Sequence, residues 1–326
     1  MKLPHRRQFL HLAAGAAALP AVSRVALAQA YPTRPVRLIV GFPAGSGADI
    51  AARLAGQWLS ERLGQSFVIE NRPGAGSSIA AEAVVRAAPD GYTLLMATAA
   101  NTINTTLYEH LSFNFARDIE PVCGFEHGSI VMVVNPSVPA KTVPEFIAYA
   151  KAQPGKINMA SAGNGTLPHV AGELFKMITG INMLHVPYRG EAPAITDLMG
   201  GQVQVYFSTL AGAMEFIRAG KVRALAVATT KRSEALPNVP AMGEFLPGYE
   251  ASSWTGIGAP KSTPPQIIEI LNKETNAGLA DSVMAARFVD LGITTLPGSS
   301  VDFGRFLAEE TEKWRKVIRF ANIKPA

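Results

Sequence analysis

The chain has 326 residues, of which 48% are hydrophobic and 17% charged, and this composition excludes a disordered or collagen-like protein. The length predicts about two domains. A single cysteine, Cys123, excludes a disulfide framework and any zinc or iron–sulfur site that needs several cysteines. The net charge of +5 comes mostly from the first 30 residues; the remainder holds 26 basic and 25 acidic residues. Because no dense run of Lys and Arg follows residue 31, we do not expect a nucleic-acid binder.

Residues 1–30 have the three parts of an export signal: a basic start, an apolar stretch and small residues at a cleavage site. The apolar stretch, Phe9–Val22, is too short to span a membrane. The run Arg6–Leu10 resembles the bacterial twin-arginine signal, with ordinary Sec export as the alternative. We expect cleavage after Ala28 or Ala30 and a mature periplasmic protein.

In the mature chain, short apolar strands alternate with amphipathic helices, which is typical of an α/β fold with mostly parallel sheets. The expected strands are Val36–Val40, Phe67–Glu70, Thr93–Ala97, Ile130–Val134, Ile157–Ala160, Met183–Val186, Val203–Phe207 and Val222–Val227. The expected helices begin near Asp49, Ser78, Thr142, Pro168, Thr263 and Val301. Because no linker separates the two domains, we expect the chain to cross between them near Phe125–Ile130 and Glu250–Trp254.

A glycine-rich loop between the first strand and the first helix is the first candidate site. Backbone N–H groups and the helix dipole at such a position favour an anion. The loop also comes close to a dinucleotide fingerprint, with Glu70 placed like a ribose-binding acid, but Ile50 stands where the third glycine should be. A tight turn without a ligand is the alternative for this loop alone. The candidate residues are Phe42, Pro43, Ala44, Gly45, Ser46, Gly47 and Asp49.

Other helix starts carry small polar residues after a strand. They include Ser78, Thr98, Asn101, Asn164, Gly165, Thr166, Ser208 and Thr209. If these starts meet in one cleft, they supply neutral donors and helix dipoles. Such groups suit the binding of a carboxylate without a reaction on it.

Signatures of catalysis are missing from the sequence. It has no Gly-x-Ser-x-Gly elbow and no His-Glu-x-x-His, and Cys123 has no partner that marks a nucleophile. His169 and Glu173 are four residues apart and could share a metal, but we favour a polar contact near the helix start. Arg189, next to Tyr188, either faces an acidic ligand or is a solvated loop residue. We therefore expect no catalytic residue, no metal and no cofactor.

Many short motifs in a fixed order resemble one known family. They are Tyr31–Val40, Phe42–Gly45 with Asp49, Glu70–Gly76, Asp90–Leu95, Gly163–His169, His185–Gly190, Leu225–Ala228 and Pro237–Pro240. The family is that of the substrate-binding receptors of tripartite tricarboxylate transporters, often called Bug proteins. The resemblance covers essentially the whole mature chain.

The resemblance implies a type II periplasmic-binding-protein fold, in which two α/β lobes close on a small carboxylate. Residues 31–127 with 252–326 would form one lobe, and residues 128–251 the other. It implies a receptor rather than an enzyme, with membrane transporter subunits as partners, and it assigns the ligand carboxylate to Phe42–Gly47 and Gly163–Thr166. We expect a monomer, and we add the other residues named above together with His169, Tyr188 and Arg189 as candidate ligand residues. The family often has acids near Val203–Phe207, where this chain has Gln204 and Ser208.

Two other functions stay open at this point. A sensor that signals to a membrane partner has the same sequence features. An exported enzyme that acts on a carboxylate, such as a hydrolase or an oxidoreductase, is the second alternative.

Overall fold

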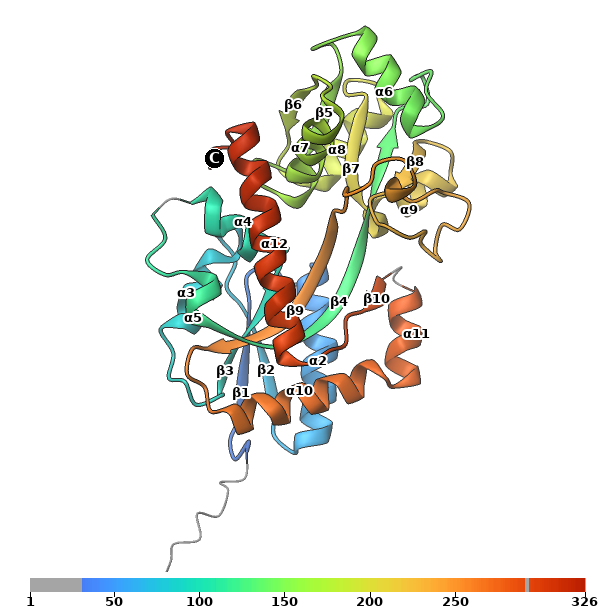
Figure 1. Cartoon of the computed structure of the whole chain (residues 1–326). Coiled ribbons are helices and arrows are strands. Elements are labelled where there is room, and N and C mark those ends of the chain that lie inside the picture. The colour runs from blue at the N-terminus through green and yellow to red at the C-terminus, as the bar shows by residue number, and fades with distance from the viewer. Residues whose placement is uncertain (1–30, 109, 291–292, 326) are drawn as a thin grey trace, which may run out of the picture.

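The computed structural model describes residues 31–108, 110–290 and 293–325, and it shows a mixed α/β protein (Figure 1). The expected signal peptide and its cleavage sites at Ala28 and Ala30 lie outside these residues. The strands are β1 (Val36–Val40), β2 (Phe67–Asn71), β3 (Thr93–Thr98), β4 (Ile119–Val134), β5 (Asn158–Ser161), β6 (Leu184–Pro187), β7 (Val205–Thr209), β8 (Arg223–Val227), β9 (Ser252–Pro260) and β10 (Ile293–Thr295). The helices are α2 (Gly47–Leu63), α3 (Ser78–Val85), α4 (Ala99–Leu107), α5 (Phe115–Asp118), α6 (Val143–Ala152), α7 (Leu167–Thr179), α8 (Glu191–Met199), α9 (Leu210–Arg218), α10 (Pro265–Leu279), α11 (Ser282–Asp290) and α12 (Ser300–Ala321), with short 3-10 turns η1 (Ala75–Ser77) and η2 (Met242–Glu244).

The eight expected strands are all present, with ends that differ by one or two residues except in β4. The expected strand Ile130–Val134 is only the last part of β4, which begins at Ile119. The sequence pattern predicts neither β9 nor the short β10. Pro121, Gly124 and two register shifts interrupt the first half of β4, so its apolar period is not regular.

The strand order is β2-β1-β3-β9-β4-β7-β5-β6, with β8 and β10 also paired to β4. β1 is parallel to β2 and β3, and β5 is parallel to β6 and β7. The antiparallel pairs among the described strands all include β4 or β9. Two parallel groups, which we call the first lobe (β1–β3) and the second lobe (β5–β7), are therefore joined by two long strands.

The exchange of partners along β4 marks the passage between the lobes. Residues 119–129 of β4 pair with β9, and from Ile130 to Val134 the same strand pairs with β7. This change falls inside the segment Phe125–Ile130 that was expected to cross. Among the described helices, none is both long and apolar enough to cross a membrane.

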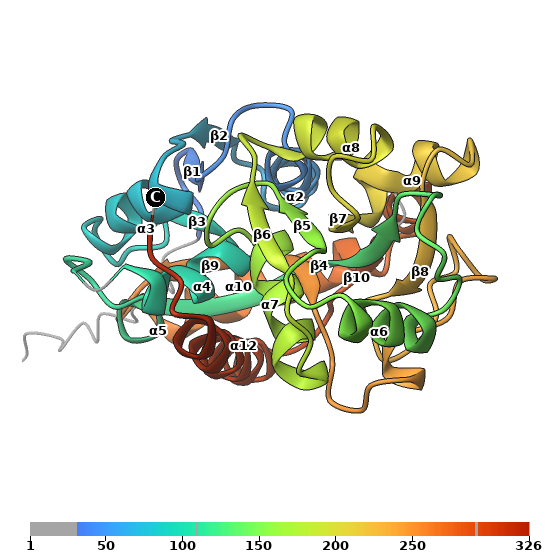
Figure 2. The same cartoon turned by 90° about the horizontal axis from the view of Figure 1, so that it is seen from above.

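Helices cover both faces of each lobe. In the view from above, α6 and α7 lie on one side of the second lobe's strands, and α8 and α9 on the other (Figure 2). α12 runs along both lobes (Figure 1): Phe303 near its start is buried in the core of the first lobe, and Val317 near its end in that of the second. The buried Glu310 carboxylate in the middle of α12 accepts hydrogen bonds from Trp254 Nε1 of β9 at 3.3 Å and Trp314 Nε1 at 2.9 Å.

Candidate functional site

The carboxyl ends of the parallel strands in the two lobes face each other. Thr209, the last residue of β7, pairs with Ile130, where β4 has just entered the second lobe. Thr98, the last residue of β3, pairs with Thr255 near the start of β9, the end that leads toward the second lobe. In open α/β sheets ligands bind outside the carboxyl ends of the strands. The loops at these two edges, which we call the facing loops, therefore form the candidate site.

The first facing loop, Phe42–Gly47, is held by a buried carboxylate. Ser46 caps α2 by accepting a hydrogen bond from Asp49 N at 3.3 Å. Asp49 is only 2% exposed, and its carboxylate accepts hydrogen bonds from Gly45 N at 2.9 Å, from Arg53 Nε at 2.9 Å and from Asn71 Nδ2 at 2.9 Å. The hydrogen bonds from Arg53, Gly45 and Asn71 lower the pKa of Asp49 to about 2. The buried Asp49 carboxylate thus fixes the conformation of the exposed loop.

The second facing loop, Gly163–Thr166, is held by a neutral imidazole. Gly165 N donates to His169 Nδ1 at 3.0 Å, so this nitrogen carries no proton. The ring of His169 stacks on that of His185, with 3.6 Å between centroids. Burial, His185 and Lys176 lower the pKa of His169 to about 3. His169 therefore supports this loop as Asp49 supports the first.

The contact between His169 and Glu173 is structural. His169 Nε2 lies 3.8 Å from Glu173 Oε1, and that oxygen accepts a hydrogen bond from Lys176 Nζ at 2.8 Å. In the described part of the chain no three His, Cys, Asp or Glu side chains gather as metal ligands would. The geometry agrees with a polar contact near the helix start.

Ser161 and His185 form a serine–histidine pair, the arrangement that activates a nucleophile in hydrolases. Ser161 Oγ and His185 Nε2 are 2.6 Å apart. Ser161 Oγ also accepts a hydrogen bond from Gly163 N at 3.1 Å, and the serine is completely buried. A hydroxyl in this position supports the second facing loop and is closed to a substrate.

The polar residues at the end of β3 hydrogen-bond mainly among themselves. Thr98 N donates to Asn101 Oδ1 at 2.9 Å in the capping box of α4, and Asn101 Nδ2 donates to Ser77 Oγ at 3.3 Å. Ser78 Oγ accepts a hydrogen bond from Asn104 Nδ2 at 3.1 Å. Thr98, Asn101 and Ser78 are all buried, so they position the turn before α3.

That turn holds non-glycine residues in the left-handed region. Ala75 has φ 44° and Ser77 has φ 74°, a conformation that costs of order 1–3 kcal/mol per residue. Asn104 Nδ2 also donates to the carbonyl of Gly76 at 2.6 Å and holds the turn in place. Such strain is most often kept at functional sites.

The donors at the start of α9 are occupied by a side chain of the protein. Glu191 Oε1 accepts hydrogen bonds from Ser208 Oγ at 2.6 Å and from Thr209 N at 3.0 Å. Thr209 Oγ1 also lies 3.0 Å from the same oxygen. Ser208 and Thr209, which the sequence suggests as donors to a ligand, therefore bind an internal carboxylate.

Tyr188 and Arg189 lie on the loop that leads to Glu191. Tyr188 Oη donates to Asp197 Oδ2 at 2.7 Å, and burial together with this carboxylate raises the pKa of Tyr188 to about 12. Arg189 is exposed. Of the two, Arg189 has the freer side chain for a solute.

Exposure separates the expected site residues into three groups. The exposed ones are Pro43, Ala44, Gly45, Gly47, Asn164 and Arg189. The half-buried ones are Phe42, Ser46, Thr166, Tyr188 and Thr209. The buried ones are Asp49, Ser78, Thr98, Asn101, Gly165, His169 and Ser208. The facing loops thus hold most of the surface that a solute can reach, and the buried residues support them.

Three residues that organise the site were not singled out in the sequence. Asn71 and Asn104 hold the first lobe's loops through amide hydrogen bonds, and no local pattern marks such long-range contacts. Glu191 follows Gly190 in the first turn of a helix, where an acid complements the helix dipole. An acid directly after a glycine at a helix start is visible in the sequence, so this signal could have identified Glu191.

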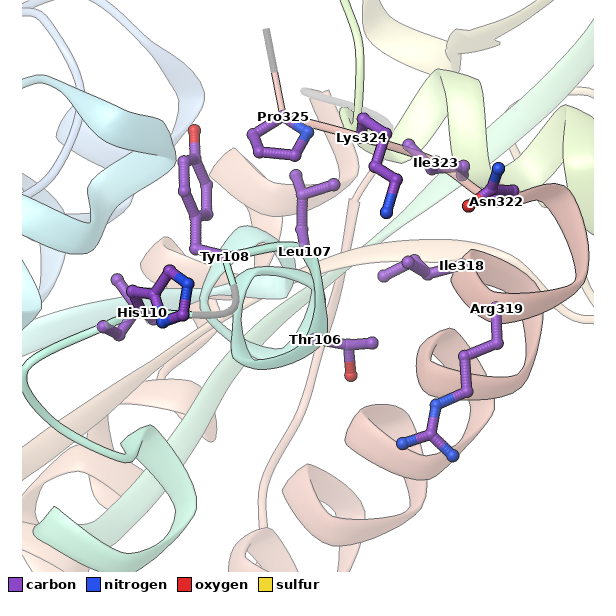
Figure 3. A pocket seen from close by; sticks show the side chains of 11 residues that line it. Thr106, Leu107, Tyr108, His110, Ile318, Arg319, Asn322, Ile323, Lys324 and Pro325 are labelled. Carbon is purple, nitrogen blue, oxygen red and sulfur yellow. The ribbon is translucent and has the colours of Figure 1, made fainter.

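Two hollows lie beside the end of α12, away from the first facing loop. One, of about 570 Å³, is bounded by Leu107 and Tyr108 at the end of α4 and by Arg319 and Asn322 on the other side (Figure 3). None of the expected ligand residues lines it. The other, of about 650 Å³, includes two expected ligand residues, Asn164 and His169, among its lining residues.

The chain matches known proteins over most of its length. The family model described as tripartite tricarboxylate transporter family receptor matches residues 51–323. Protein BugT of Bordetella pertussis is 35% identical over 91% of this chain and 92% of BugT. The sequence resemblance is thereby confirmed.

Solved structures of other proteins are similar to this chain over most of its length. R. palustris Rpa4515 with adipate has a TM-score of 0.79 and 36% identity over 91% of this chain and 100% of that one. MatC from Rhodopseudomonas palustris with bound malate has a TM-score of 0.74 and 31% identity over 88% of this chain and 100% of that one. These likenesses confirm the expected α/β, two-lobed binding-protein fold. The chain belongs to the tripartite tricarboxylate transporter receptor family, a family of binding proteins.

Proposed function

We propose that this protein is a periplasmic receptor that binds one small organic carboxylate between its lobes and delivers it to a tripartite membrane transporter. The single observation that carries the proposal is the pair of facing loops, each at the start of a helix, within a chain of this family. Two relatives of similar fold are described with adipate and with malate, both carboxylates. We propose that the receptor acts as a monomer and performs no catalysis.

The facing loops suit a carboxylate for a physical reason. The first N–H groups of a helix have no partner within the helix, and the helix dipole adds a partial positive charge there. In α2 this end is at Gly47, and in α7 it is at Leu167. A carboxylate between them accepts hydrogen bonds from both lobes and so favours the closed arrangement over the open one.

The lobe division that this proposal needs follows the expected boundaries, residues 31–127 with 252–326 and residues 128–251. The change of strand partners after Ser129 supports a hinge in β4 and β9. Closure by rotation of one lobe about such a hinge is a common response of two-lobed binding proteins to a ligand.

The alternatives have less support. An enzyme that hydrolyses esters needs an accessible nucleophile, whereas Ser161 is completely buried beside His185. A sensor differs from a transport receptor only in its partner. Uptake of the bound solute by cells with and without this protein distinguishes them, because only a transport receptor is needed for uptake.

The test is thermal unfolding of protein without its leader, first unfolded and refolded to remove retained solutes, against mono-, di- and tricarboxylates and amino-carboxylates. A ligand at about 100 times its dissociation constant adds about 2.7 kcal/mol, which raises Tm by roughly 2 °C or more per kcal/mol. The absence of any shift across the panel would overturn the proposal.

The binding position is tested at Gly47, where an added Cβ meets no atom within 4 Å. Gly47→Glu places a carboxylate at the start of α2, which the helix dipole tolerates, and it should lower carboxylate affinity at least tenfold by like-charge repulsion. Gly47→Gln has nearly the same shape without the charge and should bind nearly as well as the wild type. Equal affinity for the two variants would remove the first facing loop from the site.

A further inference from the structure

The side chain of Glu191 crosses the carboxyl edge of the second lobe. Glu191 follows β6, yet its carboxylate bonds to Ser208 and Thr209 at the end of β7. β5 lies between β6 and β7 in the sheet, so Glu191 spans the end of β5, the strand that leads into the second facing loop. Gly190 N also donates to the carbonyl of Ala162 beside that loop, at 3.3 Å. Glu191 is therefore a neighbour of the proposed ligand site.

α8 begins after β6, at the carboxyl edge of the second lobe, which is one of the two edges that bound the candidate site. In the side view α8 lies in the upper lobe and α2 in the lower one (Figure 1).

Within residues 31–108, 110–290 and 293–323, no Lys, Arg or His side chain forms an ion pair with the Glu191 carboxylate. By contrast, Lys176 pairs with Glu173, and Arg232 pairs with Glu244. Glu191 Oε1 accepts the three hydrogen bonds from Ser208 and Thr209, while Oε2 has only a 3.1 Å contact with the Thr209 hydroxyl. Oε2 therefore retains capacity to accept a hydrogen bond.

A second polar group near Glu191 is incomplete. Tyr206 of β7 is completely buried, and its hydroxyl has no hydrogen-bond partner. Burial and the negative charge of Glu191 raise the pKa of Tyr206, so the hydroxyl lies within electrostatic reach of that carboxylate. Because Tyr206 has no exposed surface, its hydroxyl contributes to the polar environment of Glu191 without contacting a solute.

We propose that Glu191 determines the ligand class: the receptor selects a monocarboxylate whose far end carries an amino group, and it rejects dicarboxylates. This inference rests on the proposed function and names the substrate class of that same site. A second carboxylate at this position finds the donors of Ser208 and Thr209 already occupied and meets a like charge. A cationic amino group instead donates to Oε2 and gives Glu191 a counter-charge.

The experiment compares three probes of one chain length by isothermal titration calorimetry: hexanoate, 6-aminohexanoate and adipate, repeated with butanoate, 4-aminobutanoate and succinate. In one of the two series the wild type should bind the amino member at least tenfold more tightly than the dicarboxylate. Glu191→Gln should lower the amino preference at least tenfold and raise the affinity for the dicarboxylate.

The matched control is Glu215→Gln, which removes the same charge from an exposed side chain of α9. It should change neither affinity more than about twofold, because the charge of an exposed side chain is screened by solvent and salt. If Glu191→Gln does not fold, Glu191→Ala and the wild-type preference still test the inference.

The outcomes separate the two proposals. A wild type that binds the dicarboxylate as tightly as the amino member, or a preference that survives Glu191→Gln as it survives Glu215→Gln, overturns the role of Glu191 and leaves the receptor function standing. Failure of all six probes to bind the wild type and every variant overturns this ligand class for Glu191, and only the absence of any shift across the wider carboxylate panel overturns the receptor function itself.

Discussion

The two facing loops have nearly the same backbone but different chemistry behind it. Gly45 and Gly165 have φ of 82° and 70°, and the following helix caps, Ser46 and Thr166, have φ, ψ of −70°, 160° and −69°, 158°. In each loop the glycine N–H donates to the side chain four residues later. That acceptor is a charged carboxylate in the first lobe and a neutral imidazole in the second. The comparison shows that one loop shape is reached with two acceptors, which differ in their response to pH.

The difference also concerns what holds each acceptor. Asp49 is fixed by charge-assisted hydrogen bonds with Arg53 and Asn71. His169 is fixed by stacking on His185 and by burial. The first support is electrostatic, and the second is a packing contact that requires the imidazole to stay neutral.

The largest effect is expected when the charged acceptor is removed. Asp49→Ala removes a buried carboxylate that accepts from Gly45 N, Arg53 Nε and Asn71 Nδ2, and hydrogen bonds to a charged group contribute about 1.5–3 kcal/mol each. Because Asn71 Nδ2 keeps the Phe42 carbonyl as an acceptor and Gly45 is open to water, we expect a loss of about 3 kcal/mol in the free energy of unfolding rather than the full sum. Urea unfolding at pH 7 measures it. Asp302→Ala, at the same position in α12 but exposed, is the control and should cost clearly less. Equal losses would mean that Asp49 does not support its loop.

The glycines of the two loops should respond differently to alanine. Both have positive φ, so each substitution carries a strain of about 1 kcal/mol. At Gly45 an added Cβ meets no atom within 4 Å, but at Gly165 it would clash with Leu107 Cδ2 of α4. We therefore expect a loss of about 1 kcal/mol for Gly45→Ala and of about 2 kcal/mol or more for Gly165→Ala. Leu107→Ala should recover part of the second loss, and thermal unfolding of the three variants and the Gly165→Ala/Leu107→Ala double variant checks this.

The smallest effect, counted per pH unit, is the pH dependence of the free energy of unfolding, which distinguishes the two loops. His169 has a pKa of about 3 in the folded protein, below its usual value of 6.5, so the unfolded chain binds a proton first. Its contribution to stability is complete above pH 6.5 and declines as pH falls toward 3, by at most about 1.4 kcal/mol per pH unit. The corresponding window for Asp49 lies between 3.8 and about 2.

His169→Phe keeps a ring against His185 and removes the titration. Unfolding in urea between pH 4 and 6.5 should then show a shallower slope than in the wild type, and His185, whose pKa is lowered to about 4, accounts for part of the slope that remains. Parallel pH profiles for the variant and the wild type would contradict this assignment.

Much of the fold was predictable because the parallel strands are short, apolar and followed by helices with clear caps. The exceptions are β9, the first half of β4 and the three-residue β10. β9 has glycines at 256 and 258, and β4 carries Pro121 and two shifts of register, so neither shows the regular pattern of a strand. Their pairing with each other over nine residue pairs stabilises them, and this is a long-range property that no local window contains.

The site was predictable at the level of loops but not of side-chain roles. Glycine-rich helix starts identify the facing loops directly. The sequence does not reveal that Asp49 and His169 face inward, because their orientation depends on Asn71 and His185, which are distant in the chain. The sequence likewise does not show that the Ser208 hydroxyl donates its hydrogen bond to Glu191, a residue from another loop.

The shared carboxylate of Glu310 gives the protein an optical reporter. Two of its three tryptophans, Trp254 and Trp314, donate to this one side chain, at the place where β9 and α12 connect the lobes. Indole emission depends on the hydrogen bonds and charges around the ring. Any rotation that separates β9 from α12 must therefore change the emission wavelength or intensity of the intrinsic fluorescence. Trp58, bonded to the carbonyl of Glu274 within the first lobe, is an internal reference, so solute capture can be followed without a dye.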